Sequence, residues 1–258
     1  MIKTRQLFDQ DTWTYTYLIF EVESKEAVIV DPVLENFLRD TILLKKLGLT
    51  LVGILETHVH ADHITAANKI RNSLGVKIYM GSKSGVKDAD VLLDDGDQIK
   101  LGTEWITAIH TPGHTKGSTT YYIDNMLFTG DTLFIGGTGR TDFQGGSAAD
   151  TFNSCKNKLF TYPDDTLVYP AHNYEGLTVS TIREERRWNP NVGDGIKEEE
   201  FIETVCHEMV HVWQGATKKM AEKQNKRLWL CKDGKYRNYT NCSYMRQPWE
   251  VEAYRMQS

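Results

Sequence analysis

The chain has 258 residues and a net charge of −5, with 40% hydrophobic and 25% charged residues. This composition is typical of a soluble globular protein with one large domain, or with one domain and an appendage. The negative charge argues against nucleic acid as a partner, and no stretch approaches the roughly 20 apolar residues that a membrane-spanning helix needs.

The predicted strands and helices alternate along the first 170 residues, which favours an α/β fold in which two sheets are covered by helices. One helix should present an apolar face that includes Leu38 and Ile42, and Gly48 should end it. In chain order, we predict strands over 14–21 and 26–30, a helix over 34–47, a strand over 51–55, a helix over about 64–73, strands over 76–80, 98–101, 104–110, 118–123 and 126–129, a helix over 147–159 and a strand over 166–169.

The start of the chain and its cysteines suggest a compartment. The first twenty residues lack the pattern of a secretory signal and the Arg- and Ser-rich character of a transit peptide. Cys155, Cys206, Cys231 and Cys242 form no pair with metal-binding spacing. We therefore expect reduced thiols and a cytoplasmic location, with a Cys231–Cys242 disulfide as the less favoured alternative.

A histidine-rich stretch follows the predicted strand over 51–55. It contains His58, His60, Asp62 and His63, and it lies where this strand ends and the next helix begins. Ligands of α/β proteins bind beyond the carboxyl ends of the strands, and His with Asp suits zinc or ferrous iron. A His-rich surface loop is the alternative, but four potential ligands in six positions favour a metal centre.

Three later loops carry further ligand-type residues. His114 lies in TPGHT, Asp131 in TGDT and His172 in YPAH, and each loop follows a predicted strand. A Gly or Pro beside each residue can form a sharp turn. A lone His at a strand end usually has a structural role, but four such loops together favour one shared metal site.

The order His-x-His-x-Asp-His, Gly-His-Thr, Gly-Asp-Thr and Pro-Ala-His resembles the metallo-β-lactamase superfamily, whose fold is an αββα sandwich. The stretches Gly139–Gly146 (GRTDFQGG), Tyr169–Tyr174 (YPAHNY) and Thr178–Pro190 are similar to the glutathione persulfide dioxygenases. This closer resemblance covers residues 5 to about 203.

The dioxygenase resemblance implies a single ferrous iron held by His58, His114 and Asp131. Two imidazoles and one carboxylate on one face leave positions open for a substrate thiolate and for dioxygen. Zinc has no redox chemistry to offer dioxygen. The implied reaction oxidises the outer sulfur of glutathione persulfide with O2 to give sulfite and glutathione.

Four other residues keep a hydrolytic alternative open. In hydrolytic relatives, His60, Asp62, His63 and His172 would complete a two-metal site that activates a bridging water. The chain would then be a glyoxalase-II-like dinuclear zinc thiolester hydrolase. In the dioxygenase interpretation, the same residues orient the iron ligands and nearby water.

The family-specific loops supply candidate substrate contacts. Arg140 can bind a glutathione carboxylate through two hydrogen bonds, or it can pair with Asp142 and shape its own loop. Tyr174 can donate to the substrate or serve only in packing. Asn173 replaces the Asp that the family pattern leads us to expect, which predicts altered support of His172.

The composition changes near residue 200, after the linker-like stretch 189–195. Net charge is −9 over residues 1–200 and +4 over residues 201–258. We therefore predict a dioxygenase domain over 1–200 and a mainly helical appendage over 201–258. A homodimer is left open.

The appendage contains His207, Glu208 and His211 in an HExxH pattern, which puts both imidazoles on one helix face beside a carboxylate that can act as a base. Glu250 or Glu252 could be a third zinc ligand. The segment resembles the C-terminal half of a zincin metallopeptidase, but it is short for an independent core and lacks the strands that usually precede such a helix. We predict a candidate zinc site in an incomplete domain. The alternatives are a C-terminal zinc metallopeptidase-like activity, a non-catalytic fusion, and an amphipathic helix with incidental His residues.

Overall fold

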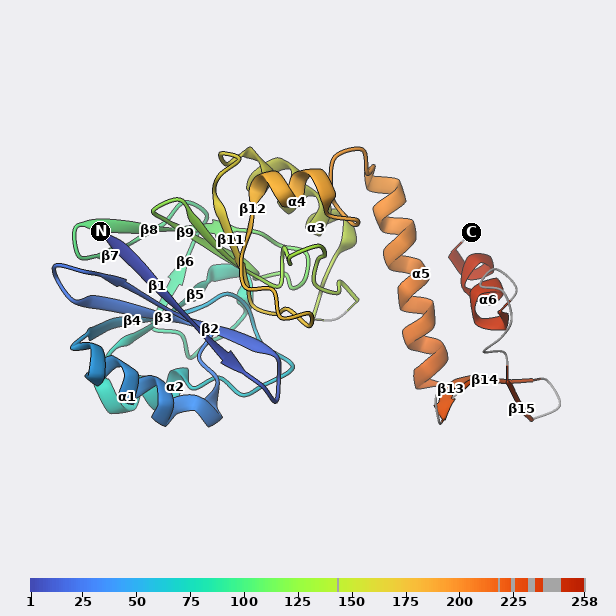
Figure 1. Ribbon diagram of the computed structural model, residues 1–258, viewed down its shortest axis with the longest axis horizontal. Helices are drawn as coiled ribbons and strands as arrows, with labels where there is room; N and C mark the ends of the chain where they lie inside the picture. The colour runs from blue at the N-terminus through green and yellow to red at the C-terminus, as the bar shows by residue number, and fades with distance from the viewer. Residues whose placement is uncertain (143, 218, 224–225, 232–234, 239–246, 258) are drawn as a thin grey trace. The chain divides into compact units, whose positions relative to one another are not determined.

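The computed structural model describes residues 1–142, 144–217, 219–223, 226–231, 235–238 and 247–257. The chain divides into two compact units, residues 1–196 and residues 197–258 (Figure 1). We call them the sandwich unit and the tail unit. Within the described residues, no helix is both long and apolar enough to cross a bilayer.

The first sheet of the sandwich unit has six strands in the order β1-β2-β3-β4-β5-β6. The first three strands pair antiparallel, and the strands from β3 to β6 pair parallel. The strands are β1 (Ile2–Asp9), β2 (Thr14–Glu21), β3 (Glu26–Val30), β4 (Thr50–Glu56), β5 (Lys77–Gly81) and β6 (Val91–Leu93).

The second sheet has the order β12-β11-β10-β9-β8-β7. Only β10 and β11 pair parallel, and this pair contains a register shift between Phe128 and Gly130. The strands are β7 (Gln98–Leu101), β8 (Glu104–His110), β9 (Thr119–Ile123), β10 (Met126–Gly130), β11 (Leu167–Pro170) and β12 (Ser180–Thr181).

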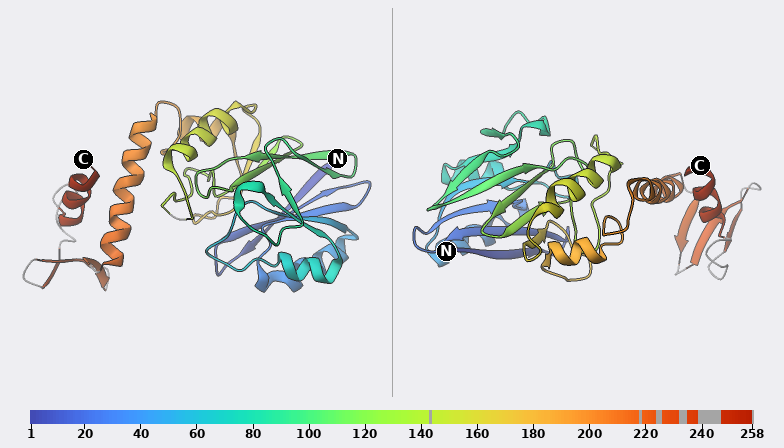
Figure 2. Two further views of the ribbon diagram at one scale, coloured as in Figure 1. Left: turned by 180° about the vertical axis from the view of Figure 1, so that it is seen from behind. Right: turned by 90° about the horizontal axis from the view of Figure 1, so that it is seen from above.

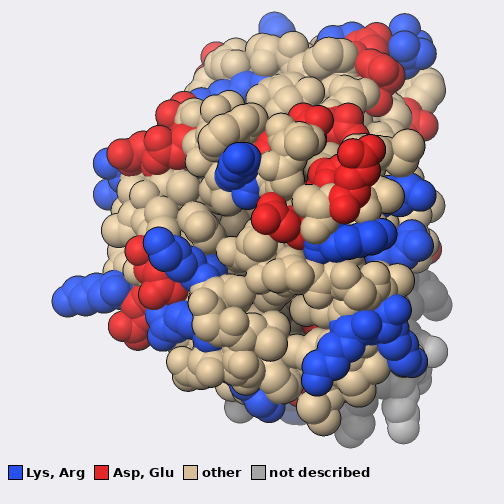
Figure 3. Space-filling model, turned by 90° about the vertical axis from the view of Figure 1, so that its left-hand side faces the viewer, with Lys and Arg blue, Asp and Glu red and all other residues tan. Residues whose placement is uncertain are grey.

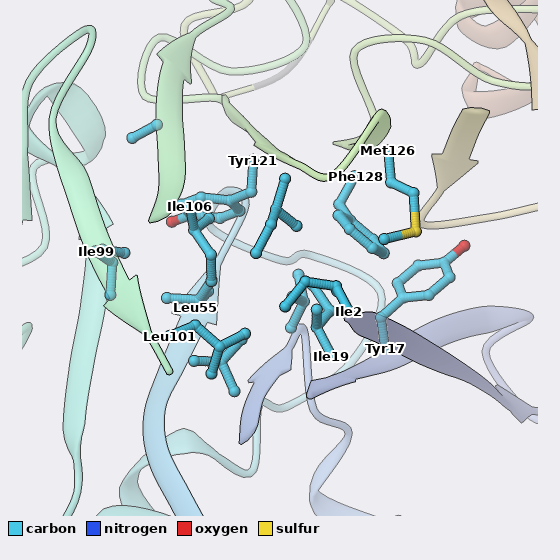
Figure 4. Close-up of a cluster of buried hydrophobic side chains, with 14 of the residues drawn as sticks. Ile2, Tyr17, Ile19, Leu55, Ile99, Leu101, Ile106, Tyr121, Met126 and Phe128 are labelled. Carbon is cyan, nitrogen blue, oxygen red and sulfur yellow. The ribbon is translucent and has the colours of Figure 1, made fainter. Parts of the chain in front are cut away.

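Strand β2 shows how the layers are built, because every residue in it is buried. Successive side chains of a strand point to opposite faces. Tyr17 and Ile19 face the second sheet and join a core that includes Phe128 (Figure 4). Leu18 and Phe20 face the other way and pack in a second cluster, which contains residues of the helices.

The helices cover the outer faces of the two sheets (Figures 1 and 2). Helices α1 (Phe37–Leu47) and α2 (Ala67–Leu74) contribute Leu44 and Ile70 to the outer cluster of the first sheet. The predicted αββα sandwich is therefore confirmed. The remaining helices are α3 (Ala148–Asn153) and α4 (Ile182–Trp188), with 3-10 turns over Leu34–Asn36, Ser82–Ser84 and Leu159–Thr161 and a π turn over Ser154–Lys158.

The predicted elements differ from the structure in a few places. Gly48 ends α1 in a left-handed conformation, as predicted. Leu38 is 67% exposed, so the buried face of this helix is narrower than predicted. The predicted helix over 147–159 breaks at Ser154 into the π and 3-10 turns. Strands β1, β6 and β12 were not predicted.

The charged side chains of the sandwich unit are mixed on the face that Figure 3 shows, where acidic and basic groups are interspersed. Inside the unit, the Cys155 thiol is buried and free, and Cys206 of the tail unit is a partly exposed free thiol. Cys242 lies outside the described residues, and so does the alternative Cys231–Cys242 disulfide.

The described part of the tail unit contains two helices and a small antiparallel sheet that was not predicted. Helices α5 and α6 contact each other, and the buried Trp249 of α6 has its ring 6.3 Å from that of Trp229. The elements are α5 (Glu198–Ala216), β13 (Met220–Lys223), β14 (Lys226–Leu230), β15 (Tyr236–Asn238) and α6 (Pro248–Gln257).

Candidate metal centre

The three residues predicted to hold iron come together at one end of the sandwich. His58 follows β4, His114 follows β8 and Asp131 follows β10 directly. Their ligand atoms all lie within 4.8 Å of one another. Asp131 Oδ2 lies 3.8 Å from His58 Nε2 and 3.5 Å from His114 Nε2. The strand ends thus bring together ligands from both sheets.

Hydrogen bonds orient both imidazoles so that Nε2 faces Asp131. The Arg140 carbonyl can only accept, so the 2.7 Å contact means that His114 Nδ1 carries the proton. The Thr57 hydroxyl donates to Asp31 and therefore accepts from His58 Nδ1, which is 2.9 Å away. In both rings the lone pair lies on Nε2, as a metal ligand requires.

Two glycines make the turns before Asp131 and His114 possible. Gly130 has φ +54°, and a Cβ there would lie 2.6 Å from the Thr57 hydroxyl oxygen. Gly113 has φ +145°, and a Cβ there would lie 2.4 Å from the backbone of Thr151. Only a residue without a side chain fits at such positions. The glycines of the Gly-His and Gly-Asp motifs therefore serve to aim the next side chain.

His60 turns away from Asp131 toward two buried carboxylates. Its Nε2 lies 3.2 Å from Asp31 Oδ1 and 3.1 Å from Glu56 Oε2. Burial alone would lower the pKa of His60, but the two carboxylates outweigh it and raise that pKa well above its usual value. Sequence reasoning missed Asp31 and Glu56, although both stand at the carboxyl ends of predicted strands.

The remaining predicted ligands are linked to the second carboxylate oxygen of Asp131 through His172 and Asp62. His172 Nε2 is 3.5 Å from Asp131 Oδ1 and 3.6 Å from Asp62 Oδ2, and its Nδ1 donates to the Trp13 carbonyl. His63 Nδ1 lies 2.9 Å from Asp62 Oδ2. Buried Asp131 Oδ1 has no hydrogen-bond partner among the described residues. An orphaned carboxylate oxygen beside the His172 imidazole suits a metal ion.

A cavity of about 620 Å³ opens over these ligands, which is a usual size for a small-molecule site. Arg140 and Tyr174 line it together with His114, Asp131 and His172. The Tyr174 ring lies nearly parallel to that of His172, with centroids 6.1 Å apart. Both predicted substrate contacts therefore border the cavity.

The side chains of Arg140 and Asn173 both make contacts within their own loops. Arg140 makes two hydrogen bonds to Asp142, of 2.7 and 2.6 Å, so in this structure it shapes its own loop. Asn173 accepts from the backbone N–H groups of Glu175 and Leu177. Its side chain therefore holds the following turn, and the support of His172 comes from elsewhere.

The tail residues form a separate group. His207, His211 and Glu250 bring their ligand atoms together, whereas Glu208 is exposed. Of the two candidate third ligands, Glu252 instead contacts Gln214 and Lys219.

Comparisons with known proteins agree with this geometry. The model of the metallo-beta-lactamase superfamily matches residues 14–172. The human mitochondrial persulfide dioxygenase ETHE1 is 46% identical over 204 residues, which cover 78% of this chain and 79% of that protein.

Solved structures give the same result. The crystal structure of ETHE1 from Myxococcus xanthus has a TM-score of 0.77 at 44% identity, covering 79% of this chain and 89% of that one. A metallo-beta-lactamase from Staphylococcus aureus has a TM-score of 0.74 at 27% identity, covering 79% and 67%. The chain therefore belongs to the metallo-β-lactamase superfamily and, within it, to the persulfide dioxygenase family.

Proposed function

We propose that the sandwich unit is an iron-dependent persulfide dioxygenase that oxidises glutathione persulfide with O2 to sulfite and glutathione. The reaction breaks the S–S bond, and one O2 and one water supply the three oxygens of sulfite. The observation that carries this proposal is the 46% identity to a persulfide dioxygenase over most of both chains.

We assign the iron to His58, His114 and Asp131, the set whose lone pairs are held in place by neighbouring hydrogen bonds. When bound, ferrous iron supplies redox activity toward dioxygen. Thr57 and the Arg140 carbonyl accept from Nδ1 of the two imidazoles and so turn Nε2 of each ring inward. This orientation is fixed before substrate arrives, so little reorganisation is needed on binding.

The position of His60 supports one metal over two. A dinuclear zinc hydrolase would use His60 as a ligand of its first metal. Here the ring is held between Asp31 and Glu56, and its Nε2 is occupied by those contacts. We therefore assign His60, Asp62, His63 and His172 to supporting the iron ligands and ordering water, and the thiolester hydrolase is not favoured.

We assign substrate binding to the cavity beside Arg140 and Tyr174. The Arg140 side chain is 56% exposed, so its guanidinium can be reached from the cavity while Asp142 holds it. A glutathione carboxylate would compete with Asp142 for the same two N–H groups. Tyr174 presents its ring at the same rim. We also propose that the two compact units are the two predicted domains.

Metal content and oxygen consumption test this proposal. Anaerobically purified chain should hold about one iron per sandwich unit and should consume O2 with glutathione persulfide. His58→Ala should lose the iron and at least about 100-fold of the rate, about 2.7 kcal/mol in barrier. His110→Ala is the matched control, because His110 lies on β8 and its ring donates to the Lys116 carbonyl rather than to a proposed iron ligand.

Two results would contradict the proposal. One is two zinc ions lost together in His58→Ala, with O2-independent hydrolysis of S-lactoylglutathione, which would establish the thiolesterase. The other is full dioxygenase activity in His58→Ala.

Light scattering of the same sample tests the homodimer that the sequence left open, and a single-chain mass would exclude it.

A further inference from the structure

The tail unit gathers three potential metal ligands that the persulfide dioxygenase activity does not use. His207 and His211 lie one turn apart on α5, and Glu250 lies on α6. His207 and Glu250 are only 7% and 3% exposed. A buried carboxylate beside two imidazoles is costly unless the group is paired or binds a cation.

The spacing of the three ligand atoms matches a tetrahedral ion. His207 Nε2 lies 3.0 Å from Glu250 Oε2 and 3.0 Å from His211 Nε2, and the third side, from His211 Nε2 to Glu250 Oε2, is 3.4 Å. Two atoms that are each about 2.0 Å from zinc at the tetrahedral angle lie about 3.3 Å apart. One ion can therefore contact all three atoms with little movement of the side chains.

Gln214 fixes the tautomer of His211. Its amide nitrogen donates to the Trp249 carbonyl at 3.0 Å, so its amide oxygen is the atom that faces His211. That oxygen can only accept, and it lies 2.9 Å from His211 Nδ1. The proton is therefore on Nδ1, and the lone pair is on Nε2, which faces His207 and Glu250.

We propose that His207, His211 and Glu250 bind one zinc ion in the tail unit. Two neutral imidazoles and one carboxylate are ligands that zinc prefers, and three protein ligands leave a fourth position for water. Glu252 is excluded as the third ligand, because Gln214 and Lys219 hold its carboxylate. The site is independent of the iron of the sandwich unit.

Zinc titration of the full chain tests the proposal. The purified, metal-free chain is titrated with Zn²⁺ against a chromophoric chelator, and the number of tight sites is compared between variants. Glu250→Gln keeps the shape of the side chain but removes its charge. It should weaken one site by at least about 10-fold, and His207→Ala should weaken the same site by at least about 100-fold.

Glu252→Gln is the matched control on the same helix, since its amide oxygen can still accept from Gln214. It should leave the affinity and the number of sites unchanged. Circular dichroism of each variant checks that α5 and α6 are formed, and Co²⁺ replaces Zn²⁺ to report tetrahedral coordination by its visible absorption. The proposal is overturned if the folded Glu250→Gln and His207→Ala chains bind as many zinc ions as the unchanged chain, with the same affinity.

Discussion

The two units build similar ligand sets by different means. In the sandwich unit, His58, His114 and Asp131 come from loops after three strands, and two sheets must pack before they meet. In the tail unit, His207 and His211 share one helix, so the helical repeat alone brings them together. The first site therefore depends on the whole fold, whereas the second depends on one helix and its contact with α6.

The surroundings of the two sites differ as well. In the sandwich unit, buried Asp31, Thr57 and main-chain carbonyls hold the imidazoles. In the tail, the Gln214 side chain accepts from His211 and orients its ring. We expect changes around the first site to cost much more folding free energy than changes around the second.

His60→Ala should show the largest difference between the units. It leaves Asp31 and Glu56 buried without their shared imidazole, and breaking a buried ion pair costs about 3–5 kcal/mol. In the metal-free chain, His211→Ala should cost only about 1–2 kcal/mol, because it leaves Gln214 short of one hydrogen bond. Urea denaturation measures both, with hydrogen exchange of β2 and α5 to assign each loss to a unit. Equal losses of unfolding free energy in His60→Ala and His211→Ala would contradict the expected difference between the two units.

Gly130→Ala tests how far the sandwich site depends on backbone shape. The new Cβ combines an unfavourable φ with a collision against Thr57, so we expect a loss of about 2–4 kcal/mol and of most bound iron. Gly85→Ala is the control, because Gly85 has φ +75° but nothing within 4 Å of the added Cβ. It should cost about 1–2 kcal/mol and leave the iron content unchanged. Similar losses of stability and of iron in both variants would show that the contact of the added Cβ with Thr57 is not the cause.

The smallest expected effect is the pH dependence of stability that the buried Cys155 thiol causes. Burial raises the pKa of Cys155 from its ordinary value of 9.0, which the unfolded thiol keeps, to about 12. Below pH 9 both states are protonated. Between pH 9 and 12 only the unfolded state loses the proton, so stability should fall by about 1.4 kcal/mol per pH unit. In Cys155→Ala, the free energy of unfolding should fall less steeply with pH between about pH 9 and 12.

Thiol labelling of the native chain, read by mass spectrometry, complements that measurement. Partly exposed Cys206 in the tail unit should react well before Cys155, because the thiolate is the reactive form and burial suppresses it. Faster labelling of Cys155 would show that the sandwich opens more readily than the tail.

Much of the fold could be predicted because several strands, such as β2 and β10, are fully buried and bounded by turns. Strands β2 and β3 were predicted residue for residue. Strand β1 was missed because it is an edge strand whose exposed Lys3 and Arg5 break the apolar pattern. Leu38 and Ile42 were predicted to lie on the buried face of their helix, but both are exposed. Helical spacing does not show how wide a face of the helix packs against the sheet.

The site was predicted as far as side-chain identity allows. Strand ends with His or Asp were recognisable, and they do converge. Asp31 and Glu56 were not recognised, because a carboxylate after a strand is usually solvated and only the packed sheets show that these two are buried. The roles of the Arg140 and Trp13 carbonyls could not be predicted at all, since every residue has a carbonyl.

Residue 140 has two roles, because its main-chain carbonyl contacts His114 and its side chain lines the cavity. The carbonyl of residue 140 orients the imidazole whichever side chain stands there, while the guanidinium faces the cavity. In the proposed function, exchanging the side chain would change which thiol is accepted, and the carbonyl of residue 140 would still accept from His114 only while the loop keeps its shape. Because Arg140 also pairs with Asp142, position 140 couples substrate preference to the stability of its own loop.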